Sequence, residues 1–232
     1  MVQYKHYSFD LWLTIIKSNP FFKEERANYF FKNLNWKNKS LDEVKSIFRQ
    51  VDDMCNVINE QTGKNISSDE MYLMVVYQIN ESKEVIGKVN LTDLKTEMDI
   101  LFFRYLPVLY NNETKDIIAL LASREHTTLN ILSNTAFIEG KLLRELLDML
   151  EIGQYFDFQI YSDEVGMSKP NIKLFEHLIK KIQDLRSAEN IQLSDIIHVG
   201  DNHAADYLGA KAAGINSFLI NSNLQLITNL VN

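Results

Sequence analysis

The chain has 232 residues, 46% of them hydrophobic and 24% charged, which is typical of a globular protein with one large or two small domains. A formal net charge of −7 argues against a nucleic-acid surface, and no apolar run is long enough to span a membrane. The single cysteine, Cys55, excludes an intrachain disulfide. A single cysteine and an amino terminus without an apolar signal core together predict a cytoplasmic protein. No pattern indicates an oligomeric state.

The first predicted strand covers residues 5–9 and ends on a carboxylate, Asp10. A tight turn follows, with a hydroxyl on Thr14. α/β proteins bind ligands at the carboxyl edge of their sheet, so an acid there is well placed to react. Such an Asp can attack phosphorus and carry a covalent phosphoryl group, although a lone Asp after a strand also serves as a helix cap or turn former.

Residues 19–106 are predicted to be all-helical, with no strand. Four helix-start signals lie in this segment, at Asn19 with Pro20, Ser40 with Glu43, Ser67 with Glu70, and Thr92. The last of these helices is expected to end before Pro107, because the residue before a proline disfavours helical backbone.

After Pro107, strand and helix patterns alternate as in parallel α/β units. Predicted helices cover 113–124, 138–150, 171–185 and 204–213, and predicted strands cover 128–132, 156–161, 195–199 and 217–220. Near-continuous apolar runs suit strands that are buried on both faces of a parallel sheet. The expected fold class is therefore α/β, with a Rossmann-like parallel sheet core, helices on both faces and an inserted all-helical cap domain.

The predicted domains are an α/β hydrolase core of residues 1–16 and 107–232 and a helical cap of residues 17–106. The cap leaves the core just after Asp10, beside the edge of the sheet that carries the acid. A lid is useful at that place because its closure excludes water and adds substrate contacts.

Polar groups follow four separated segments that a parallel sheet would bring to one edge. They are Asp10, Ser133 with Asn134, Lys169 before Pro170, and Asp201 with Asp206. The four stretches that carry them, at residues 9–14, 131–134, 166–170 and 198–206, resemble in kind and order the motifs of the haloacid dehalogenase-like hydrolase superfamily. The helical segment resembles the cap that this family places between its first two motifs.

The acids predict a magnesium site. Mg²⁺ prefers octahedral oxygen sites built from one or two carboxylates, waters and substrate phosphate. Asp10, Asp201 and the backbone carbonyl of Trp12 could supply the protein ligands. Asp206 could bind the metal or hold its water shell.

The remaining groups suit phosphoryl transfer, which depends on positioning and charge neutralisation. Asp10 would be the nucleophile. Ser133 and the amide of Asn134 would donate hydrogen bonds to phosphoryl oxygens, and Lys169 would neutralise the phosphoryl group and Asp10 as a point cation. The expected partner is a small phosphorylated substrate.

Each of these residues also has a purely structural interpretation. Lys169 could be a solvated loop lysine, and Ser133 could cap the following helix. Asp201 and Asp206 could be acids that a helix amino terminus favours. His198 lies within an apolar strand and is expected to be a core histidine with satisfied hydrogen bonds.

One position departs from the family's phosphatases, which usually carry a second Asp two residues after the nucleophile. Trp12 stands there and cannot exchange a proton. Loss of a general acid or base costs about a hundred- to ten-thousand-fold in rate. The enzyme could use substrates with good leaving groups, another group such as His203 could substitute, or turnover could be poor.

The resemblance thus implies a Mg-dependent phosphatase that forms an aspartyl-phosphate, with two alternatives. The family's dehalogenases carry an aromatic residue where Trp12 stands, but they lack the acidic pair that Asp201 and Asp206 provide. A non-enzymatic binding protein would use Trp12 and the aromatic residues of the helical segment. Those residues are Phe21, Phe22, Tyr29, Phe30, Phe31 and Trp36.

Overall fold

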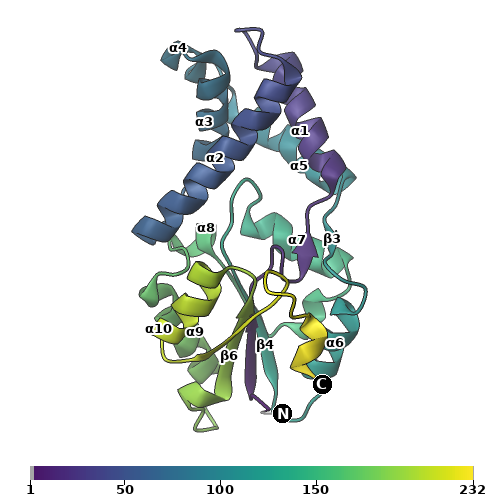
Figure 1. Ribbon diagram of the computed structural model, residues 1–232, viewed down its shortest axis with the longest axis vertical. Helices are drawn as coiled ribbons and strands as arrows, with labels where there is room; N and C mark the ends of the chain where they lie inside the picture. The colour runs from purple at the N-terminus through teal and green to yellow at the C-terminus, as the bar shows by residue number, and fades with distance from the viewer. Residues whose placement is uncertain (1–2, 232) are drawn as a thin grey trace.

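The computed structural model describes residues 3–231, so residues 1, 2 and 232 of the predicted core lie outside the described part. Its centre is a five-stranded parallel sheet in the order β5-β4-β1-β6-β7 (Figure 1). These strands are β1 (His6–Phe9), β4 (Thr128–Ser133), β5 (Phe158–Tyr161), β6 (Ile196–Gly200) and β7 (Asn216–Leu219). The predicted α/β class is confirmed.

Helices lie above the sheet and on both of its faces (Figure 1). The helices between β2 and β3 are α1 (Pro20–Asn33), α2 (Leu41–Thr62), α3 (Ser68–Asn80), α4 (Lys83–Ile86) and α5 (Leu91–Arg104). Those that accompany the sheet are α6 (Thr114–Ala122), α7 (Gly140–Met149), α8 (Ser162–Val165), α9 (Ile172–Leu185) and α10 (Gly209–Ala212). A π-helical turn, η3 (His203–Leu208), precedes α10, and a 3₁₀-helix, η4 (Ile227–Leu230), lies near the carboxyl terminus.

The two faces of β1 differ in chemistry, because successive side chains of a strand point to opposite sides. Tyr7 and Phe9 join the apolar cluster that α6, α7 and η4 cover. His6 and Ser8 point to the other face, where their side chains bond to polar groups of β4 and β6. The central strand therefore carries a buried polar row that leads towards Asp10.

The chain leaves and re-enters the sheet region through a short antiparallel ribbon. Its strands are β2 (Ile16–Lys17) and β3 (Val108–Leu109), which pair Ile16 with Leu109 and Lys17 with Val108. The five helices between them gather above the carboxyl ends of the parallel strands (Figure 1). The predicted domain boundaries, after residues 16 and 106, lie at or beside this ribbon and stay a prediction.

An aromatic cluster fills the space between these helices. Phe30 packs edge-on against Phe48, with ring centroids 4.8 Å apart, and lies against Tyr72. Phe137, from the loop after β4, reaches up into the same cluster and lies 5.0 Å from the Tyr72 ring. Of the six aromatic residues considered as a partner surface, Phe22 and Phe30 are buried, Tyr29 is half-buried, and Phe21, Phe31 and Trp36 are exposed.

Local signals placed most helix ends correctly. Both predicted capping boxes form, with Ser40 and Ser67 as the capping residues. The prediction for α5 was wrong, because Asn90 rather than Thr92 accepts from the first free amides. The predicted helix over residues 204–213 begins instead at His203 as the π-helical turn.

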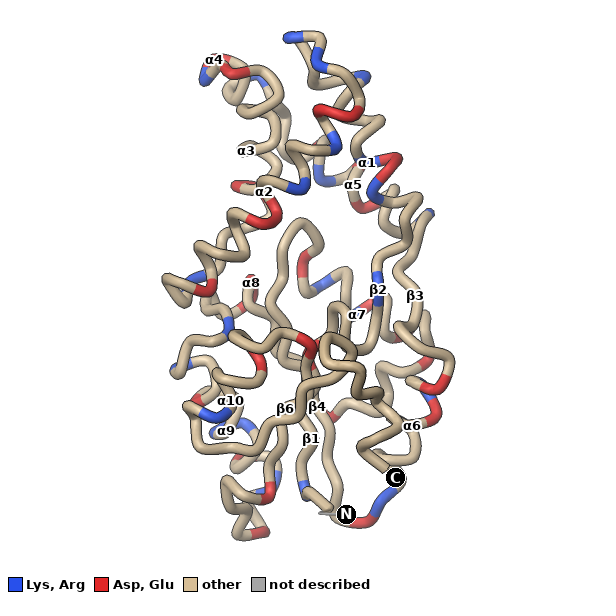
Figure 2. Tube along the Cα trace, viewed as in Figure 1, with Lys and Arg blue, Asp and Glu red and all other residues tan. Residues whose placement is uncertain are grey.

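Charged residues of both signs are scattered along the whole trace, in the helices above the sheet and around it (Figure 2). Along the trace of residues 3–231, Lys and Arg are interspersed with Asp and Glu rather than gathered in one segment (Figure 2). Within residues 3–231, no helix combines the length and the apolar character needed to cross a bilayer.

Candidate active site

Asp10 lies at the end of the central strand. Its backbone amide continues the ladder by donating to the carbonyl of Val199 at 2.8 Å. The turn that follows brings the Thr14 hydroxyl back to donate to Asp10 Oδ2 at 3.1 Å. Leu13, within the turn, has a φ of 58°, a left-handed conformation that non-glycine residues rarely adopt. The strand and the strained turn together fix the Asp10 carboxylate at the carboxyl edge of the sheet.

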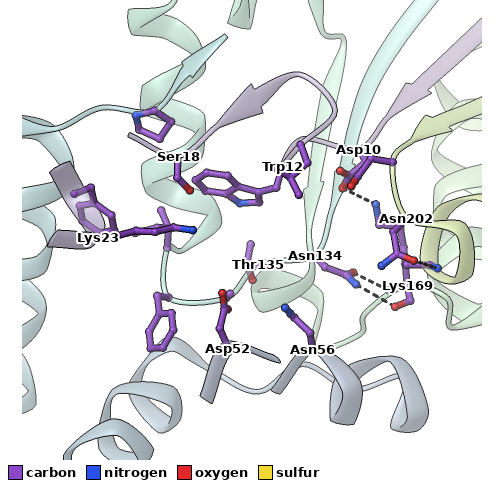
Figure 3. Close-up of a pocket in the computed structure, with 18 of the residues that line it drawn as sticks. Asp10, Trp12, Ser18, Lys23, Asp52, Asn56, Asn134, Thr135, Lys169 and Asn202 are labelled. Carbon is purple, nitrogen blue, oxygen red and sulfur yellow. Dashed lines mark hydrogen bonds and ion pairs between the residues drawn. The ribbon is translucent and has the colours of Figure 1, made fainter. Parts of the chain in front are cut away.

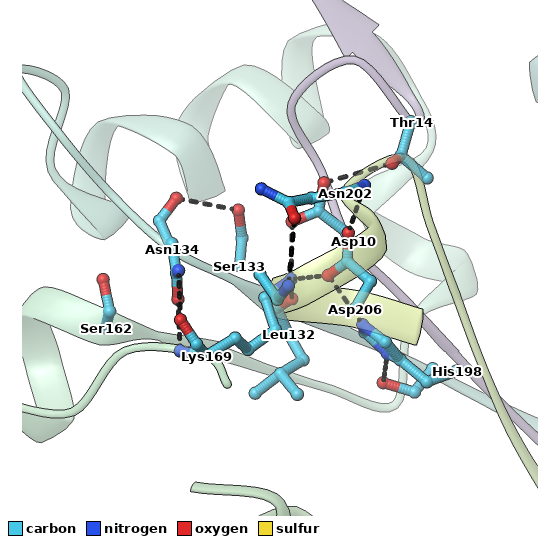
Figure 4. Close-up of polar contacts among 12 residues, drawn as sticks. Asp10, Thr14, Leu132, Ser133, Asn134, Ser162, Lys169, His198, Asn202 and Asp206 are labelled. Atoms are coloured by element: carbon cyan, nitrogen blue, oxygen red, sulfur yellow. Dashed lines mark hydrogen bonds and ion pairs between the residues drawn. The ribbon is translucent and has the colours of Figure 1, made fainter. Parts of the chain in front are cut away.

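Lys169 is buried beside Asp10 and uses all three of its N–H donors (Figure 4). Its Nζ donates to Asp10 Oδ1 at 2.7 Å, to Asp206 Oδ1 at 2.6 Å and to the carbonyl of Leu132 at 2.7 Å. Burial favours the neutral amine, yet the charges of Asp10 and Asp206 keep the pKa of Lys169 above its usual value. The interpretation of Lys169 as a solvated loop residue was wrong.

Asn134 positions Lys169 through its backbone. The Asn134 side chain accepts from the Lys169 amide at 2.7 Å and donates to the Lys169 carbonyl at 3.0 Å (Figure 4). This two-bond clamp joins the loop after β4 to the loop that carries the lysine. Because both backbone groups are held, the ammonium is directed to a fixed point between the acids.

Asp206 is held from several sides. Its Oδ2 accepts from the Asn202 amide at 2.9 Å, and its Oδ1 contacts His198 Nε2 at 3.1 Å. Burial opposes the charged form, but the Lys169 ammonium and the His198 ring keep the pKa of the Asp206 carboxyl below its usual range. The carboxyl group also lies against Gly200, where an added Cβ would come within 2.2 Å of it.

Three carboxylates meet at this point. One oxygen each of Asp10, Asp201 and Asp206 lies within 4.8 Å of the others. Burial, followed by the charges of Asp10 and Asp206, raises the pKa of Asp201 to about 7. A single lysine balances three acids, so the cluster keeps an excess of negative charge.

A cavity of about 320 Å³ opens between these acids and the helices above them. At one end are Asp10 and Lys169, and at the other end Lys23 of α1 and Asp52 of α2 point inward (Figure 3). The indole of Trp12 lies between the two ends (Figure 3). The volume is near the lower end of the range for small-molecule sites.

Most of the predicted site residues line this cavity, but two do not. Asp10, Trp12, Asn134, Lys169, Asp201 and Asp206 all contribute to its wall. Ser133 is buried beneath it and donates to the carbonyl of Asn134 at 3.1 Å. It caps no helix, because α7 begins only at Gly140 after Glu139. His203 is exposed and stacks on Tyr207, so it does not face the cavity.

His198 is the buried histidine that the sequence indicated, and it also reaches the site. Its Nδ1 lies 2.9 Å from Ser8 Oγ and its Nε2 contacts Asp206. Burial lowers the pKa of this ring. The buried polar row on β1 is thus connected through His198 to Asp206 of the site.

Arg26 lines the cavity and was not recognised from the sequence. It lies on α1 four residues after Phe22 and four before Phe30, and all three side chains are buried. A basic residue on the apolar stripe of a helix is the signal that could have identified it, since an arginine is almost never fully buried unless it is paired.

Segments of the chain are similar to phosphatases. A glyceraldehyde 3-phosphate phosphatase of Methanothermobacter thermautotrophicus is 35% identical over 98 residues, which are 41% of this chain and 38% of that protein. The pyrimidine 5′-nucleotidase YjjG of Escherichia coli is 32% identical over 77 residues, 33% of this chain and 32% of that protein. The matched segments therefore span about a third of these relatives' length.

The fold as a whole matches that of a solved structure. The HAD-hydrolase YfnB of Bacillus subtilis, solved bound to magnesium, superposes with a TM-score of 0.70 at 15% identity. The superposition covers 97% of this chain and 92% of YfnB. The model of the family described as haloacid dehalogenase-like hydrolase matches residues 4–214. With nearly the whole chain matched, this protein belongs to the haloacid dehalogenase-like hydrolases.

Proposed function

We propose that this hydrolase is a magnesium-dependent phosphatase that moves the phosphoryl group of a small phosphorylated metabolite first to Asp10 and then to water. The observation that carries the proposal is one buried ammonium, on Lys169, bonded to both Asp10 and Asp206 at one end of the cavity. Similarity to two phosphatases agrees with this reaction class.

The acid cluster fits a divalent cation. Three carboxylate oxygens within 4.8 Å of one another, with a surplus of negative charge, are the hard oxygen donors that Mg²⁺ takes. Asp10, Asp201 and Asp206 would hold the ion, with the Trp12 carbonyl as a further ligand. When bound, the ion supplies positive charge that neutralises phosphoryl oxygens.

Asp10 is the proposed nucleophile. One carboxylate oxygen forms a bond to phosphorus while the bond from phosphorus to the ester oxygen breaks, and the leaving oxygen takes a proton. Water then attacks the phosphorus, which releases inorganic phosphate and restores the Asp10 carboxylate. Lys169, already bonded to Asp10, neutralises charge as it develops on the transferred group.

The groups around the phosphoryl site would orient it. The backbone amide of Asn134 is the proposed hydrogen-bond donor to phosphoryl oxygens. Ser133 would join it only when its hydroxyl, which donates to the Asn134 carbonyl, turns towards the cavity. Trp12 borders the cavity and offers no proton, so the leaving oxygen depends on solvent or on its own low basicity. We therefore expect faster turnover of esters with good leaving groups.

The helices of residues 17–106 would act as a cap over this site. They supply most of the cavity wall opposite the acids. Because this wall would exclude water, the electrostatic contacts of the reaction would be stronger than in solvent.

The experiment is phosphate release from p-nitrophenyl phosphate with and without Mg²⁺, measured beside halide release from 2-chloropropionate. We expect Mg²⁺-stimulated phosphate release that EDTA abolishes. Asp10→Asn should reduce the rate by about a thousandfold or more, because it removes the nucleophile. Asp53→Asn, at an exposed position of α2, is the matched control and should keep the parent rate.

Three results would contradict the proposal. Phosphate release that survives EDTA would contradict the metal dependence. An Asp10→Asn variant with the parent activity would contradict the role of Asp10 as the nucleophile. Halide release without phosphate release would make the protein a dehalogenase. The aromatic Trp12 beside Asp10 is the feature that makes this last comparison worth running.

A further inference from the structure

A buried arginine lines the cavity one turn along α1 from Lys23. Arg26 is 7% exposed and lines the cavity from α1. Its guanidinium carbon lies 4.2 Å from the ring centroid of Phe48 and 4.4 Å from that of Phe137. The ring centroid of Phe22, one turn earlier on α1, lies 5.4 Å from the guanidinium carbon.

Aromatic rings satisfy the faces of a guanidinium but not its N–H edge. Arg26 Nε is buried without a hydrogen-bond partner, and within residues 3–231 no carboxylate forms an ion pair with Arg26. Burial lowers the pKa of Arg26, whereas the nearby Tyr72 and Asp52 raise it. An arginine stays charged in proteins, so this site holds a fixed cation whose Nε–H has no partner among residues 3–231.

A second cation faces the same space. Lys23 lies one turn before Arg26 on α1, and its ammonium points into the cavity (Figure 3). Asp52 enters from α2 opposite (Figure 3). Glu60, a further acid of the wall, accepts a hydrogen bond from Asn202 near the other end. Arg26 and Lys23 therefore place two cations against one nearby acid, a surplus of one positive charge.

We propose that Arg26 and Lys23 form a carboxylate subsite, so that the substrate is a small phosphorylated carboxylic acid held with its phosphoryl group at Asp10. This inference rests on the phosphatase function proposed above and names its substrate class. A surplus of one positive charge matches a single carboxylate better than a second, dianionic phosphate. The planar N–H edge of a guanidinium also matches the two oxygens of a carboxylate.

The cavity size agrees with this class. About 320 Å³ accommodates a short carbon chain with two charged ends. The indole of Trp12, between the two ends, would contact the carbon chain of the substrate (Figure 3).

The alternative is that Arg26 only joins α1, α2 and the loop after β4 through its aromatic neighbours. A pair of substrates separates the two roles. 3-Phosphoglycerate and glycerol 3-phosphate share a three-carbon skeleton and a phosphate, and they differ in whether the other end is a carboxylate or an alcohol. If Arg26 is only structural, its replacement should change kcat/KM for both substrates equally. If Arg26 binds the substrate carboxylate, its replacement should lower kcat/KM for the acid alone.

The test compares kcat/KM for the two substrates in the parent protein, Arg26→Met, Arg26→Lys and Lys23→Met. We expect the parent to prefer the acid. Arg26→Met keeps an apolar stem between the rings and should lower kcat/KM for the acid by about 10- to 100-fold, the value of hydrogen bonds to a charged group. The alcohol should change little. Arg26→Lys should restore part of the preference, and Lys23→Met should weaken it.

Lys32→Met is the matched control, because Lys32 is an exposed lysine of the same helix and does not line the cavity. It should leave the preference unchanged. Lys23 is also exposed, so its replacement tests the subsite without disturbing the packing around Arg26.

Binding provides a readout that does not depend on turnover. Calorimetry with Asp10→Asn and Asp10→Asn/Arg26→Met, each with Mg²⁺, should show that the arginine strengthens binding of 3-phosphoglycerate and leaves glycerol 3-phosphate unaffected. Equal losses for both substrates, or a parent protein without preference for the acid in rate and in binding, would overturn the subsite. Absence of turnover on any phosphate ester would instead overturn the phosphatase, and the binding comparison would still decide the subsite.

Discussion

At the residue scale, Lys169 determines how the acidic side chains are arranged. Its three N–H donors are all engaged, two with carboxylates and one with the carbonyl of Leu132. A buried ammonium held in this way cannot turn without breaking an ion pair. Asp10 and Asp206 are therefore already fixed in the free protein, and in the proposed reaction this would lower the reorganisation that catalysis needs.

His6 gives a prediction for the dependence of stability on pH. Burial lowers the pKa of the His6 ring from 6.5 to about 4. The unfolded chain therefore binds a proton at higher pH than the folded protein does. The stability linked to neutral His6 is fully present above pH 6.5 and is lost as pH falls towards 4, by about 3 kcal/mol in total.

The measurement is the free energy of unfolding by urea between pH 7 and pH 4, for the parent and for His6→Gln. Contributions from other buried groups, such as His198, are present in both proteins and cancel in the difference. The stability advantage of the parent over the variant should shrink as the pH falls. Equal pH slopes would show that His6 does not titrate as described.

Residues that follow strands could be predicted as a site, because the carboxyl ends of parallel strands share one edge of a sheet. Asp10, Lys169 and the acidic pair of Asp201 with Asp206 were found in this way and do meet. Arg26 lies on a helix of the inserted segment, whose orientation depends on packing against the core. Sequence spacing alone does not fix that orientation.

At the element scale, the carboxyl end of α2 anchors the helices to the sheet region. Gly63 ends α2 in a left-handed conformation with φ of 67°. Its carbonyl accepts from the Ser168 amide at 3.1 Å and from Asn171 Nδ2 at 2.9 Å. Ser168 precedes Lys169, so this contact ties the proposed cap to the loop that carries the Lys169 ammonium.

Gly63→Ala should weaken this anchor. An added Cβ would meet Asn171 Nδ2 at 2.7 Å, and the left-handed backbone disfavours alanine by about 1 to 2 kcal/mol. We expect lower thermal stability and faster amide exchange at the end of α2, measured by calorimetry and by hydrogen exchange.

Gly87→Ala is the control. Gly87 also follows a helix, but its φ is −69° and the nearest atom to an added Cβ is 3.9 Å away. This change should be neutral or slightly stabilising, because it reduces the freedom of the unfolded chain. Equal losses of thermal stability for Gly63→Ala and Gly87→Ala would contradict the explanation that Gly63 anchors α2.

Elements with strong local signals could be predicted, and elements set by their neighbours could not. The two capping boxes depend on residues three apart and formed as expected. Asn90 and Thr92 are both good caps two residues apart, and the structure uses Asn90, whose side chain accepts from the amides of Thr92 and Asp93. The ribbon strands Ile16–Lys17 and Val108–Leu109 have two residues each, too short for an alternating pattern, and form because the chain crosses there twice.

At the scale of the whole molecule, the proposed metal site predicts that the stability of the fold depends on Mg²⁺. The three carboxylates are brought together only in the folded chain, so an ion bound there stabilises the native state. At a free Mg²⁺ concentration about a hundred times the dissociation constant, the gain is about 3 kcal/mol. For a chain of this size, the melting temperature should rise by about 5 to 10 °C.

Thermal unfolding with added MgCl₂, against NaCl of equal ionic strength and against EDTA, measures this rise. Asp201→Asn should lose most of it, because Asp201 is a proposed ligand. Asp53→Asn should keep it. A rise of the same size in NaCl would mean general screening of negative charge and would contradict a specific site.

The ribbon of β2 and β3 has one more consequence for the molecule. Because Ile16 pairs with Leu109, the two crossings of the chain lie next to each other although 92 residues separate them along the sequence. A segment whose ends are adjacent can be lengthened, shortened or replaced by recombination without displacing the strands that hold the acids. Descendants of this protein could therefore acquire new substrates by exchanging the module between the crossings, while the reaction chemistry stays as inherited.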